Sequence, residues 1–554
     1  MLKYWKLSGL VVLAAAVGFV AGRAQDNKTT VQISHVSAAE KIIGLEFTTV
    51  EKDSMLDDLN ENLENYQKVR TVYVGNDVPM ALQFNPIPVG WNPDRSQRIV
   101  VLSEPERTER PDDLNDLAFY SVTELAGLIR SRKVTSVELT RMYIGRLKKY
   151  GPQLECVVTL TEPRAMERAQ RADQEIEDGN YRGPLHGIPF GAKDLLAVRG
   201  YPTTWGAVPY EGQVLEVDAE VIKRLDDAGA VLVAKLTLGA LAWGDVWFGG
   251  KTRNPWNLEQ GSSGSSAGSA SATSAGLVAF AIGTETWGSI VSPATRCGVT
   301  GLRPTYGRVS RTGAMALSWS MDKIGPICRT VEDCAVVFQA IAGPDGVDQT
   351  LIDLPFNYDA RVPVGELRVG YTKSLFEADY GNRKADAATL ERLREQGVKL
   401  VPIELPDFPI EALSYILTAE AAAAFDDLTR SGRDDLMVRQ IKGAWPNVFR
   451  SSRLIPAVEY IQANRIRHML VQDMQRVMAD IDVYVVPSFG GNNLLMTNLT
   501  GHPCVVLPNG FNEEGSPVSI TFIGKLFDEG TVLVAAKGYQ DATDFHTKHP
   551  PLFP

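Results

Sequence analysis

Cysteine and histidine are scarce in this chain, which has 5 cysteines and 6 histidines among 554 residues. The sequence contains no C-x-x-C and no H-x-x-x-H pair, two spacings that bring metal ligands together, so we predict no metal site. The odd number of cysteines does not assign a disulfide. We expect most of them to be buried apolar residues: Cys156, Cys297, Cys328, Cys334 and Cys504.

An excess of positive charge is also missing. The chain has 67 acidic against 56 basic side chains, a net charge of −11 at pH 7 and a pI of about 5.3. Such a balance disfavours nucleic acid and anionic membranes as partners. An apolar share of 44% is ample for a packed core, and the length allows several domains or one large α/β enzyme.

The apolar run near the N-terminus is short. It covers residues 7–20, whereas a helix needs roughly 20 apolar residues to cross a bilayer. Lys3 and Lys6 precede it and small residues follow, up to Ala24, which is the pattern of a secretory signal peptide. We predict a leader over residues 1–24 and an exported protein, periplasmic or secreted. An uncleaved anchor is the alternative, because Arg23 is unusual beside a cleavage site.

The remaining chain divides into an N-terminal extension, residues 25–115, and a core, residues 116–554. The extension has one expected helix, residues 51–70, followed by proline-rich and charged connector. In the core, helices alternate with short apolar strands, which predicts an α/β fold with a large sheet covered on both faces. The expected helices are 121–132, 135–151, 164–178, 218–228, 385–396 and 456–479, and the expected strands are 230–236, 398–403, 483–486 and 504–507.

Charge is absent between Glu259 and Glu285, where Gly, Ser, Ala and Thr dominate. A flexible linker is the default interpretation of this composition. The apolar run 277–282 that follows favours a buried strand instead. A tight turn after that strand, residues 283–289, can present several backbone N–H groups to an oxyanion, with Ser289 beside them as a nucleophile.

Residues 261–310 resemble the amidase signature family. Its pattern is a Gly/Ser-rich segment, then G-T-[DE]-x-x-G-S, then C-G-x-x-G-L-[KR]-P-T-x-G-R-V-S, which residues 297–310 match closely. The family also has a lysine in the context G-x-P-x-x-x-K-D, present here as residues 187–194. The resemblance extends from about Ser121 to the C-terminus. It implies the fold of that family, a large mixed β-sheet with helices on both faces, and no cofactor.

The resemblance assigns a role to each motif position. Ser289 is expected to attack the carbonyl, and Lys193 to act as the base. Ser265, which carries a cis peptide bond in the family, is expected to relay the proton between them, with Ser266 hydrogen-bonded near the lysine. The oxyanion is expected on the backbone N–H groups of Thr286, Trp287, Gly288 and Ser289.

A lysine is a base only when it is neutral. Its ordinary pKa is about 10.4, and a working value of about 7 to 8 requires about 4 kcal/mol of differential interaction. Burial supplies this effect, and apolar residues on both sides of Lys193 favour a buried position. The neighbouring Asp194 opposes the shift if its carboxylate faces the amine.

The sequence departs from the commonest family pattern at several positions. Glu285 stands where Asp is usual, Trp287 where Gly or a small polar residue is usual, Ala267 where Gly is usual, and Val291 where Arg is frequent. The first two resemble a subset similar to bacterial peptide amidases, with G-T-E-T-x-G-S. Trp287 keeps its backbone N–H, but its indole can line or narrow the pocket.

Two other motifs offer alternatives. Residues 264–268 fit G-x-S-x-G, the nucleophile elbow of α/β-hydrolases, which would make Ser266 the nucleophile. That elbow needs a strand directly before the serine, and we expect a loop over residues 254–260. His502 lies in a C-terminal N-x-x-G-x-P stretch; we interpret it as a packing residue, because this mechanism needs no histidine. We interpret the D-x-x-G-P stretch at 322–326 as scaffold.

The sequence therefore predicts a hydrolase that cleaves a carboxamide C–N bond through an acyl-enzyme, with a small-molecule or peptide amide as its substrate. Peptide C-terminal, aryl, fatty and short aliphatic amides all remain open. The glutamine-amidotransferase subunit of the same family is disfavoured, since it works in the cytoplasm with partner subunits. An inactive binding protein, its pocket altered by Trp287, is the alternative from another class, ahead of an α/β-hydrolase-type esterase.

Overall fold

The computed structural model describes residues 30–554, so the predicted leader, residues 1–24, lies outside the described residues. The chain forms two compact units, Met1–Val74 and Gly75–Pro554. The second unit therefore includes residues 75–115, which we grouped with the N-terminal extension; a domain boundary at 115 stays a prediction. Within residues 30–554, no helix combines the length and the apolar character needed to cross a bilayer.

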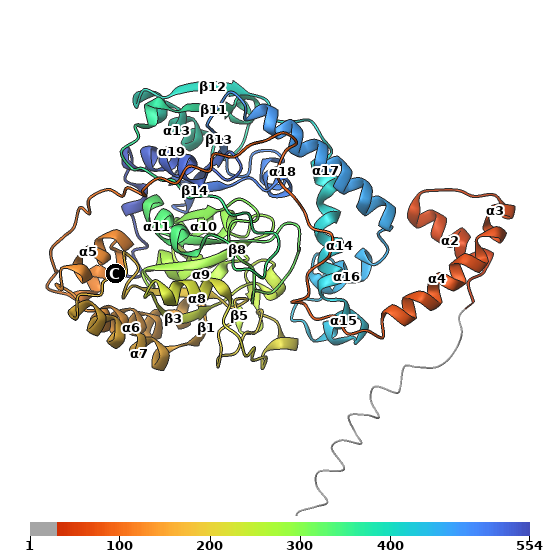
Figure 1. Cartoon of the computed structure of the whole chain (residues 1–554), viewed down its shortest axis with the longest axis horizontal. Helices are drawn as coiled ribbons and strands as arrows, with labels where there is room; N and C mark the ends of the chain where they lie inside the picture. Colours follow the sequence, from red (N-terminus) through yellow and green to blue (C-terminus); the bar gives the residue numbers. More distant parts are fainter. Residues whose placement is uncertain (1–29) are drawn as a thin grey trace, which may run out of the picture. The chain divides into compact units, whose positions relative to one another are not determined.

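The described part of the first unit is helical (Figure 1). It holds α2 (Ile33–Ile43), α3 (Thr49–Ser54) and α4 (Leu56–Val69). The single helix predicted over 51–70 is thus two helices that meet at Met55. The first begins earlier than predicted, because Thr48 and Glu51 form a reciprocal capping box that satisfies the first N–H groups.

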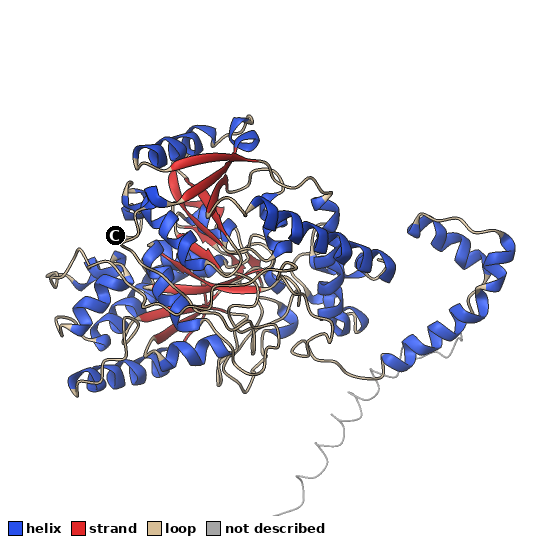
Figure 2. Ribbon diagram, turned by 45° about the horizontal axis from the view of Figure 1, so that its top comes forward, coloured by secondary structure: helices blue, strands red, loops and turns tan. Residues whose placement is uncertain are grey.

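The second unit is built on an 11-stranded mixed sheet with helices on both sides (Figure 2). The predicted α/β fold with a large mixed sheet is confirmed. In spatial order the strands are β1 (Val157–Leu160), β3 (Val231–Leu236), β2 (Pro189–Lys193), β8 (Phe280–Glu285), β10 (Lys323–Cys328), β9 (Thr300–Arg303), β14 (Cys504–Phe511), β15 (Pro517–Gly524), β13 (Val483–Pro487), β11 (Arg368–Thr372) and β12 (Lys399–Ile403).

Helices follow the sequence pattern closely in this unit. The capping boxes at Ser121 and Thr135 both form, and they start α5 and α6 where predicted. The longer helices are α5 (Val122–Arg130), α6 (Ser136–Leu154), α7 (Glu162–Glu177), α8 (Glu220–Asp227), α9 (Ala267–Ser274), α11 (Val331–Ile341), α13 (Arg383–Glu395), α14 (Tyr415–Ala424), α16 (Trp445–Ser452), α17 (Ala457–Val477), α18 (Asn493–Thr500) and α19 (Glu529–Asp541); α10 (Val291–Cys297), α12 (Lys373–Glu377) and α15 (Asp426–Arg430) are shorter.

The Gly/Ser-rich segment is not a linker, because residues 267–274 form α9 and all eight are buried. Small side chains let this helix lie close to the sheet, where the Ser269 hydroxyl donates to the carbonyl oxygen of Ile282 at 3.0 Å. The strand predicted over 277–282 begins later, at Phe280, and extends to Glu285. Antiparallel pairing with β10, from Lys323 opposite Glu285 to Ile327 opposite Ala281, fixes this register.

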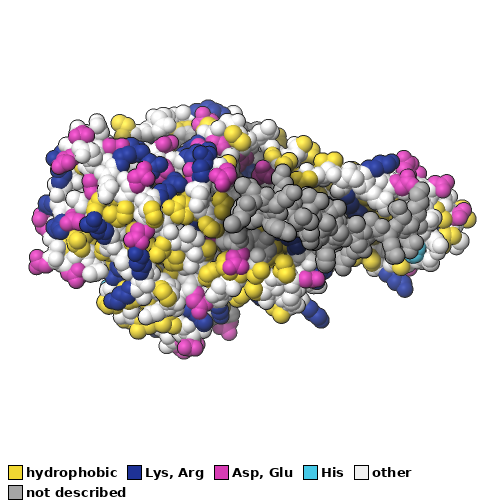
Figure 3. Space-filling model, turned by 90° about the horizontal axis from the view of Figure 1, so that it is seen from below, with side chains coloured by type: hydrophobic (Ala, Val, Ile, Leu, Met, Phe, Trp, Pro, Cys, Tyr) yellow, Lys and Arg dark blue, Asp and Glu magenta, His cyan; other side chains and the backbone are white. Residues whose placement is uncertain are grey.

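Residues 75–115 lie against the core of the second unit. Phe84 packs edge-on against Tyr306, with ring centroids 5.2 Å apart, and the Val101 N–H donates to the carbonyl oxygen of Tyr358 at 2.9 Å. All five cysteines are buried and free, which confirms that they are core residues. Basic and acidic side chains are interspersed on the face seen in Figure 3, in agreement with the mixed charge of the sequence.

The sheet topology brings the candidate residues to one edge. Strands β2 and β8 are parallel neighbours, with Phe190 opposite Phe280 and Ala192 opposite Ile282. Carboxyl ends of adjacent parallel strands lie at the same edge of a sheet. Lys193 is the last residue of β2, and the turn 286–289 follows the last residue of β8. The fold therefore positions the predicted base and the predicted oxyanion turn side by side.

Candidate active site

The Lys193 amine lies at the centre of a cluster of hydroxyl groups. Its Nζ atom is 2.8 Å from Ser265 Oγ, 3.1 Å from Ser266 Oγ and 2.8 Å from Thr284 Oγ1. Lys193 and Ser266 are fully buried, and Ser265 is 1% exposed. The structure thus brings three of the predicted site residues into direct contact. Thr284, which sequence reasoning did not single out, completes the set around the amine.

Burial lowers the pKa of Lys193 from its ordinary value to about 7, although the negative charges of Asp322 and Glu285 oppose that effect. The neighbouring Asp194 does not face this amine. Its carboxylate forms an ion pair of 2.7 Å with Lys235 and accepts from the Thr204 N–H at 2.9 Å. About half of the Lys193 amines are therefore neutral at pH 7, and a neutral amine can accept a proton.

Ser265 and Ser266 have different hydrogen-bonding roles. The peptide bond between Gly264 and Ser265 is cis, as the family resemblance implies. The Ser266 hydroxyl donates to the Thr284 carbonyl at 3.0 Å and accepts from the Thr284 N–H at 3.1 Å, so both its lone pairs and its proton are engaged locally. The Ser265 hydroxyl has only Lys193 as its partner within the described residues. Ser265 is therefore the serine free to exchange a proton with another group.

Ser289 is held next to this pair through the main chain. Its carbonyl oxygen accepts from the Ser266 N–H at 3.1 Å, and the residue is 8% exposed. Within residues 30–554 the Ser289 hydroxyl makes no hydrogen bond, so the contact with Ser265 that we expected is not formed in this structure. The structure places Ser289 at the site but leaves its hydroxyl free to turn.

The turn after β8 presents its backbone as expected. Gly288 has a φ of +82°, a conformation that L side chains rarely adopt, and this lets the chain reverse direction before Ser289. The N–H groups of residues 286–289 donate no hydrogen bond within the described part of the chain. The Thr286 hydroxyl donates to Asp322 at 2.6 Å, and the Trp287 side chain is 45% exposed. The turn can therefore offer several unpaired donors to an anion.

Glu285, the last residue of β8, holds the turn 286–289 in place through its carboxylate. Burial alone would raise the pKa of Glu285, but its ion pair with Arg303 and hydrogen bonds from the Val291 N–H and the Asn498 amide hold the pKa at about 2. The carboxylate accepts from Arg303 Nη1 and from Asn498 Nδ2, each at 2.8 Å, and from the Ile290 and Val291 N–H groups. A carboxylate at this position thus ties the turn, α10, β9 and α18 together.

We expect the substitution Glu285→Ala to lower the free energy of unfolding by about 3 to 5 kcal/mol, because it leaves the fully buried Arg303 without its counter-ion. The midpoint of urea unfolding, followed by circular dichroism, measures the change. Glu395→Ala is the matched control, since it removes a carboxylate from an exposed ion pair with Arg392 and should cost about 0.5 kcal/mol or less. Equal midpoints for the two variants would contradict the anchoring role of Glu285.

The segment before Ser265 is a hairpin and not the loop that we expected. Residues 254–260, expected as loop, form β6 (Arg253–Asn254) and most of β7 (Asn257–Gly261), a short hairpin closed by the turn at Pro255 and Trp256. This hairpin is not part of the central sheet, so it does not supply the strand that a nucleophile elbow needs. A further hairpin joins β4 (Val246–Trp247) to β5 (Gly250–Lys251).

His502 is a packing residue, as interpreted. It is fully buried, its Nδ1 lies 2.7 Å from the Thr500 hydroxyl, and burial lowers its pKa to about 3, which keeps it neutral. Its carbonyl oxygen accepts from Arg303 Nη2 at 2.9 Å. The 322–326 stretch is structural as well, because Asp322 accepts from Thr286 and from the Leu317 N–H at 2.8 Å.

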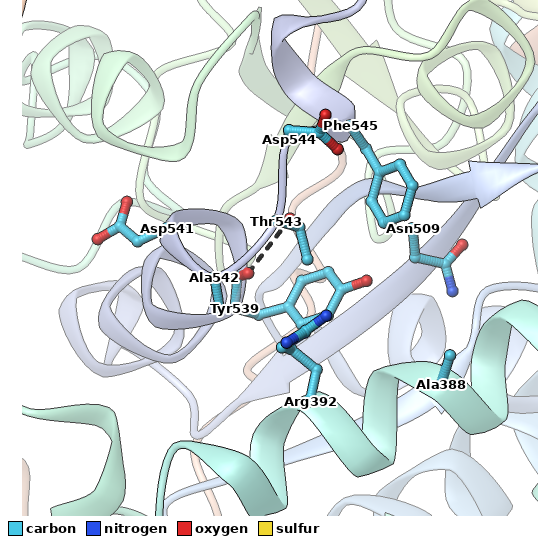
Figure 4. A pocket seen from close by; sticks show the side chains of 9 residues that line it. All are labelled: Ala388, Arg392, Asn509, Tyr539, Asp541, Ala542, Thr543, Asp544 and Phe545. Atoms are coloured by element: carbon cyan, nitrogen blue, oxygen red, sulfur yellow. Dashed lines mark hydrogen bonds between the residues drawn. The ribbon is translucent and has the colours of Figure 1, made fainter.

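Two cavities of the second unit differ in their relation to these residues. The hollow in Figure 4, of about 450 Å³, lies between α13, β14 and the end of α19; Arg392, Asn509 and Tyr539 are among its lining residues, and none of the site residues lines it. A cavity of about 350 Å³ instead reaches Thr284 and Thr286. We call this second space the threonine cavity.

Comparison with known proteins agrees with this geometry. A model of the family described as Amidase matches residues 138–495. The subunits A of glutamyl-tRNA(Gln) amidotransferase from Roseiflexus sp. (strain RS-1) and Marinomonas sp. (strain MWYL1) are 36% and 33% identical to this chain; the alignments cover 76% and 78% of it and 96% and 98% of those proteins. The solved peptide amidase from Stenotrophomonas maltophilia is 30% identical, with a TM-score of 0.70, over 79% of this chain and 99% of that one. The chain belongs to the amidase signature family, a family of enzymes that act on amides.

Proposed function

We propose that this protein hydrolyses a carboxamide through an acyl-enzyme, with Ser289 as nucleophile, Ser265 as proton relay and Lys193 as base. The observation that carries the proposal is the Lys193 amine, buried, with a pKa of about 7 and 2.8 Å from the Ser265 hydroxyl. A neutral amine in that position can accept a proton, and the Ser265 hydroxyl is a partner that can deliver one.

The proposed reaction has two halves. The Ser289 hydroxyl turns toward Ser265 and attacks the carbonyl carbon, while its proton passes to Ser265 and the Ser265 proton passes to Lys193. The resulting oxyanion accepts hydrogen bonds from the N–H groups of residues 286–289. Collapse of this intermediate breaks the C–N bond, and the Lys193 proton returns through Ser265 to the leaving nitrogen. Water then attacks the acyl-enzyme along the same path and releases the acid.

The names of the relatives point to two uses of this chemistry. The amidotransferase relatives are named as subunits, and the solved neighbour is named as a peptide amidase. We propose a hydrolase rather than an amidotransferase subunit, and an exported one, because the sequence begins with the pattern of a leader peptide. The Glu285 and Trp287 positions, which resemble the peptide amidase subset, support the same choice.

A fluorophosphonate probe tests the proposal without knowledge of the substrate. We expect one adduct, mapped by peptide mass spectrometry to Ser289 and absent from Ser289→Ala. The base works only when neutral, so the labelling rate should be low below the Lys193 pKa, rise with pH through about 7 and level off above it. An adduct on Ser266, or a rate that is flat from about pH 5 to about pH 9, would contradict these roles. An intact protein that no probe labels would favour the alternative, an inactive binding protein.

A further inference from the structure

The threonine cavity runs from the surface of the second unit to the reaction centre. Its inner end is formed by Thr284, whose hydroxyl touches the Lys193 amine, and by Thr286, the first residue of the turn that ends at Ser289. Its outer end includes Val217 and Val347, which are 47% and 65% exposed. A group that enters from the surface can therefore extend to within one side chain of the proposed base.

The walls of this cavity favour a neutral, apolar occupant. Apolar side chains are prominent in its lining, among them Leu195, Met315, Leu317, Trp319 and Ile324. Charged side chains also reach the cavity, and the cationic ones have partners: Arg311 pairs with Asp348 at 3.0 Å, Lys223 pairs with Glu220 at 3.4 Å, and Lys323 donates to the carbonyl of Met321. The Asp322 carboxylate accepts from Thr286, Leu317 and Ser318. A substrate with a free carboxylate would find its possible cationic partners engaged, whereas a hydrocarbon group would displace only water.

One wall comes from the segment 76–83, which lies outside the residues that match the family model. Asn76, Asp77, Pro79 and Gln83 line the cavity. The Asn76 side chain fixes this wall, because its Nδ2 donates to the carbonyl of Ala316 at 2.9 Å and to that of Ala424 at 3.2 Å, while its Oδ1 accepts from the Ala316 N–H at 2.8 Å. An amide that pairs with the N–H and the carbonyl of one residue acts like a short piece of sheet.

Hydrogen bonds connect the Asn76 side chain to the turn 286–289, first through the loop at Ala316 and then through Asp322. Ala316 precedes Leu317 and Ser318, whose N–H groups donate to Asp322 at 2.8 and 2.9 Å. The other carboxylate oxygen of Asp322 accepts from the Thr286 hydroxyl. Asn76 is thus a positioning residue for the loop that forms both the cavity wall and the support of the oxyanion turn.

We propose that the threonine cavity binds the acyl group of the substrate, that this group is neutral and apolar, and that the segment 76–83, held by Asn76, sets its size. The inference rests on the proposed function, since it assumes that Ser289 is acylated. A volume of about 350 Å³ is at the lower end of ligand pockets, so a compact aliphatic or aryl acyl group fits better than a long fatty chain. The specificity of this enzyme then depends on a segment that precedes the family-matched region.

Alkyl fluorophosphonates test this proposal on the full chain, because their alkyl group takes the place of the acyl chain. The measured quantity is the ratio of the labelling rate constants of Ser289 for a butyl and a methyl probe. We expect the butyl probe to react about tenfold faster with the unmodified protein. Ala314→Phe, which fills the cavity, and Asn76→Ala, which releases its wall, should each bring the ratio to about one, because each slows the butyl probe more than the methyl probe.

Asn447→Ala is the matched control, because within the described residues the side chain of that exposed asparagine donates only to the nearby Lys442 carbonyl, and the variant should keep the original ratio. A ratio of one in the unmodified protein, or an unchanged ratio in Ala314→Phe, overturns the inference while methyl labelling of Ser289 upholds the proposed function. Absence of methyl labelling overturns the proposed function itself. If Asn76→Ala loses its cooperative unfolding transition, Ala314→Phe decides the question alone.

Discussion

Replacement of Ser289 by alanine is expected to lower kcat/KM for amide hydrolysis by about 10⁴-fold or more, since the variant has no atom that can form the acyl-enzyme. The residual rate would come from attack by water on a carbonyl whose oxygen is held by the backbone donors of residues 286–289. The substrate is first identified by a screen of peptide amides, aryl amides and aliphatic amides with the unmodified protein. Initial rates with the best of these amides, at enzyme concentrations high enough to detect slow turnover, give the ratio.

Ser292→Ala provides the control for this loss. Ser292 is three residues away, and within residues 30–554 its hydroxyl pairs only with that of Ser263, at 2.8 Å. Its removal should change kcat/KM by less than about threefold, as expected of a partly exposed side chain away from the chemistry. If Ser289→Ala kept more than a tenth of the activity, the nucleophile would have to be another serine, with Ser265 the nearest candidate.

The second large effect is expected at Lys193. Lys193→Met should lower kcat by about 10³- to 10⁴-fold, because Ser265 then has no group to which it can pass a proton. The methionine side chain is of similar length and apolar, so it suits a site that is already fully buried. The unfolding transition should therefore persist, and steady-state kinetics with the amide chosen for Ser289 measure the loss.

Lys193→Arg distinguishes a lysine that acts as a base from a lysine that only supplies a positive charge. A guanidinium remains protonated at any pH at which the protein is folded, so it can donate to Ser265 but cannot accept its proton. We expect this variant to be as inactive as Lys193→Met, without the rise in rate near pH 7. Substantial activity in Lys193→Arg would show that a permanent positive charge is enough at this site, and it would contradict the role of Lys193 as the base.

Much of the fold could be predicted because its local patterns agree with its tertiary structure. The capping boxes at Ser121 and Thr135 depend on residues three apart, and both helices start where these boxes place them. The break at Met55 and the late start of β8 were missed. The early start of the first helix follows from the capping box of Thr48, and the late start of β8 follows from pairing that begins at Phe280, opposite Phe190, and at Ala281, opposite Ile327.

The site was predictable only as far as its motifs extend. Lys193, Ser265 and the turn 286–289 lie in motifs, and the parallel strands bring them together. The partners of those motifs were not visible, because each is a long-range contact. Lys235 draws Asp194 away from the proposed base, and Thr284 reaches Lys193 from the neighbouring strand. Thr284 is the threonine of the G-T-[DE]-x-x-G-S motif, but the motif does not show that its hydroxyl contacts the lysine. The direction in which the Ser289 hydroxyl points is a rotamer, which no sequence pattern encodes.

The hydrogen bond from Asn498 to Glu285 also has a consequence for the synthesis of this protein on the ribosome. These residues are 213 positions apart, and translation at typical rates takes roughly 10 to 40 s to cover that distance. During this interval the nascent chain already holds Ser289 and Lys193 but lacks the amide that completes the support of the turn. A chain whose synthesis stops before residue 498 therefore carries the proposed nucleophile without the Asn498 contact that supports the proposed oxyanion turn, and the complete site exists only after most of the chain has been made.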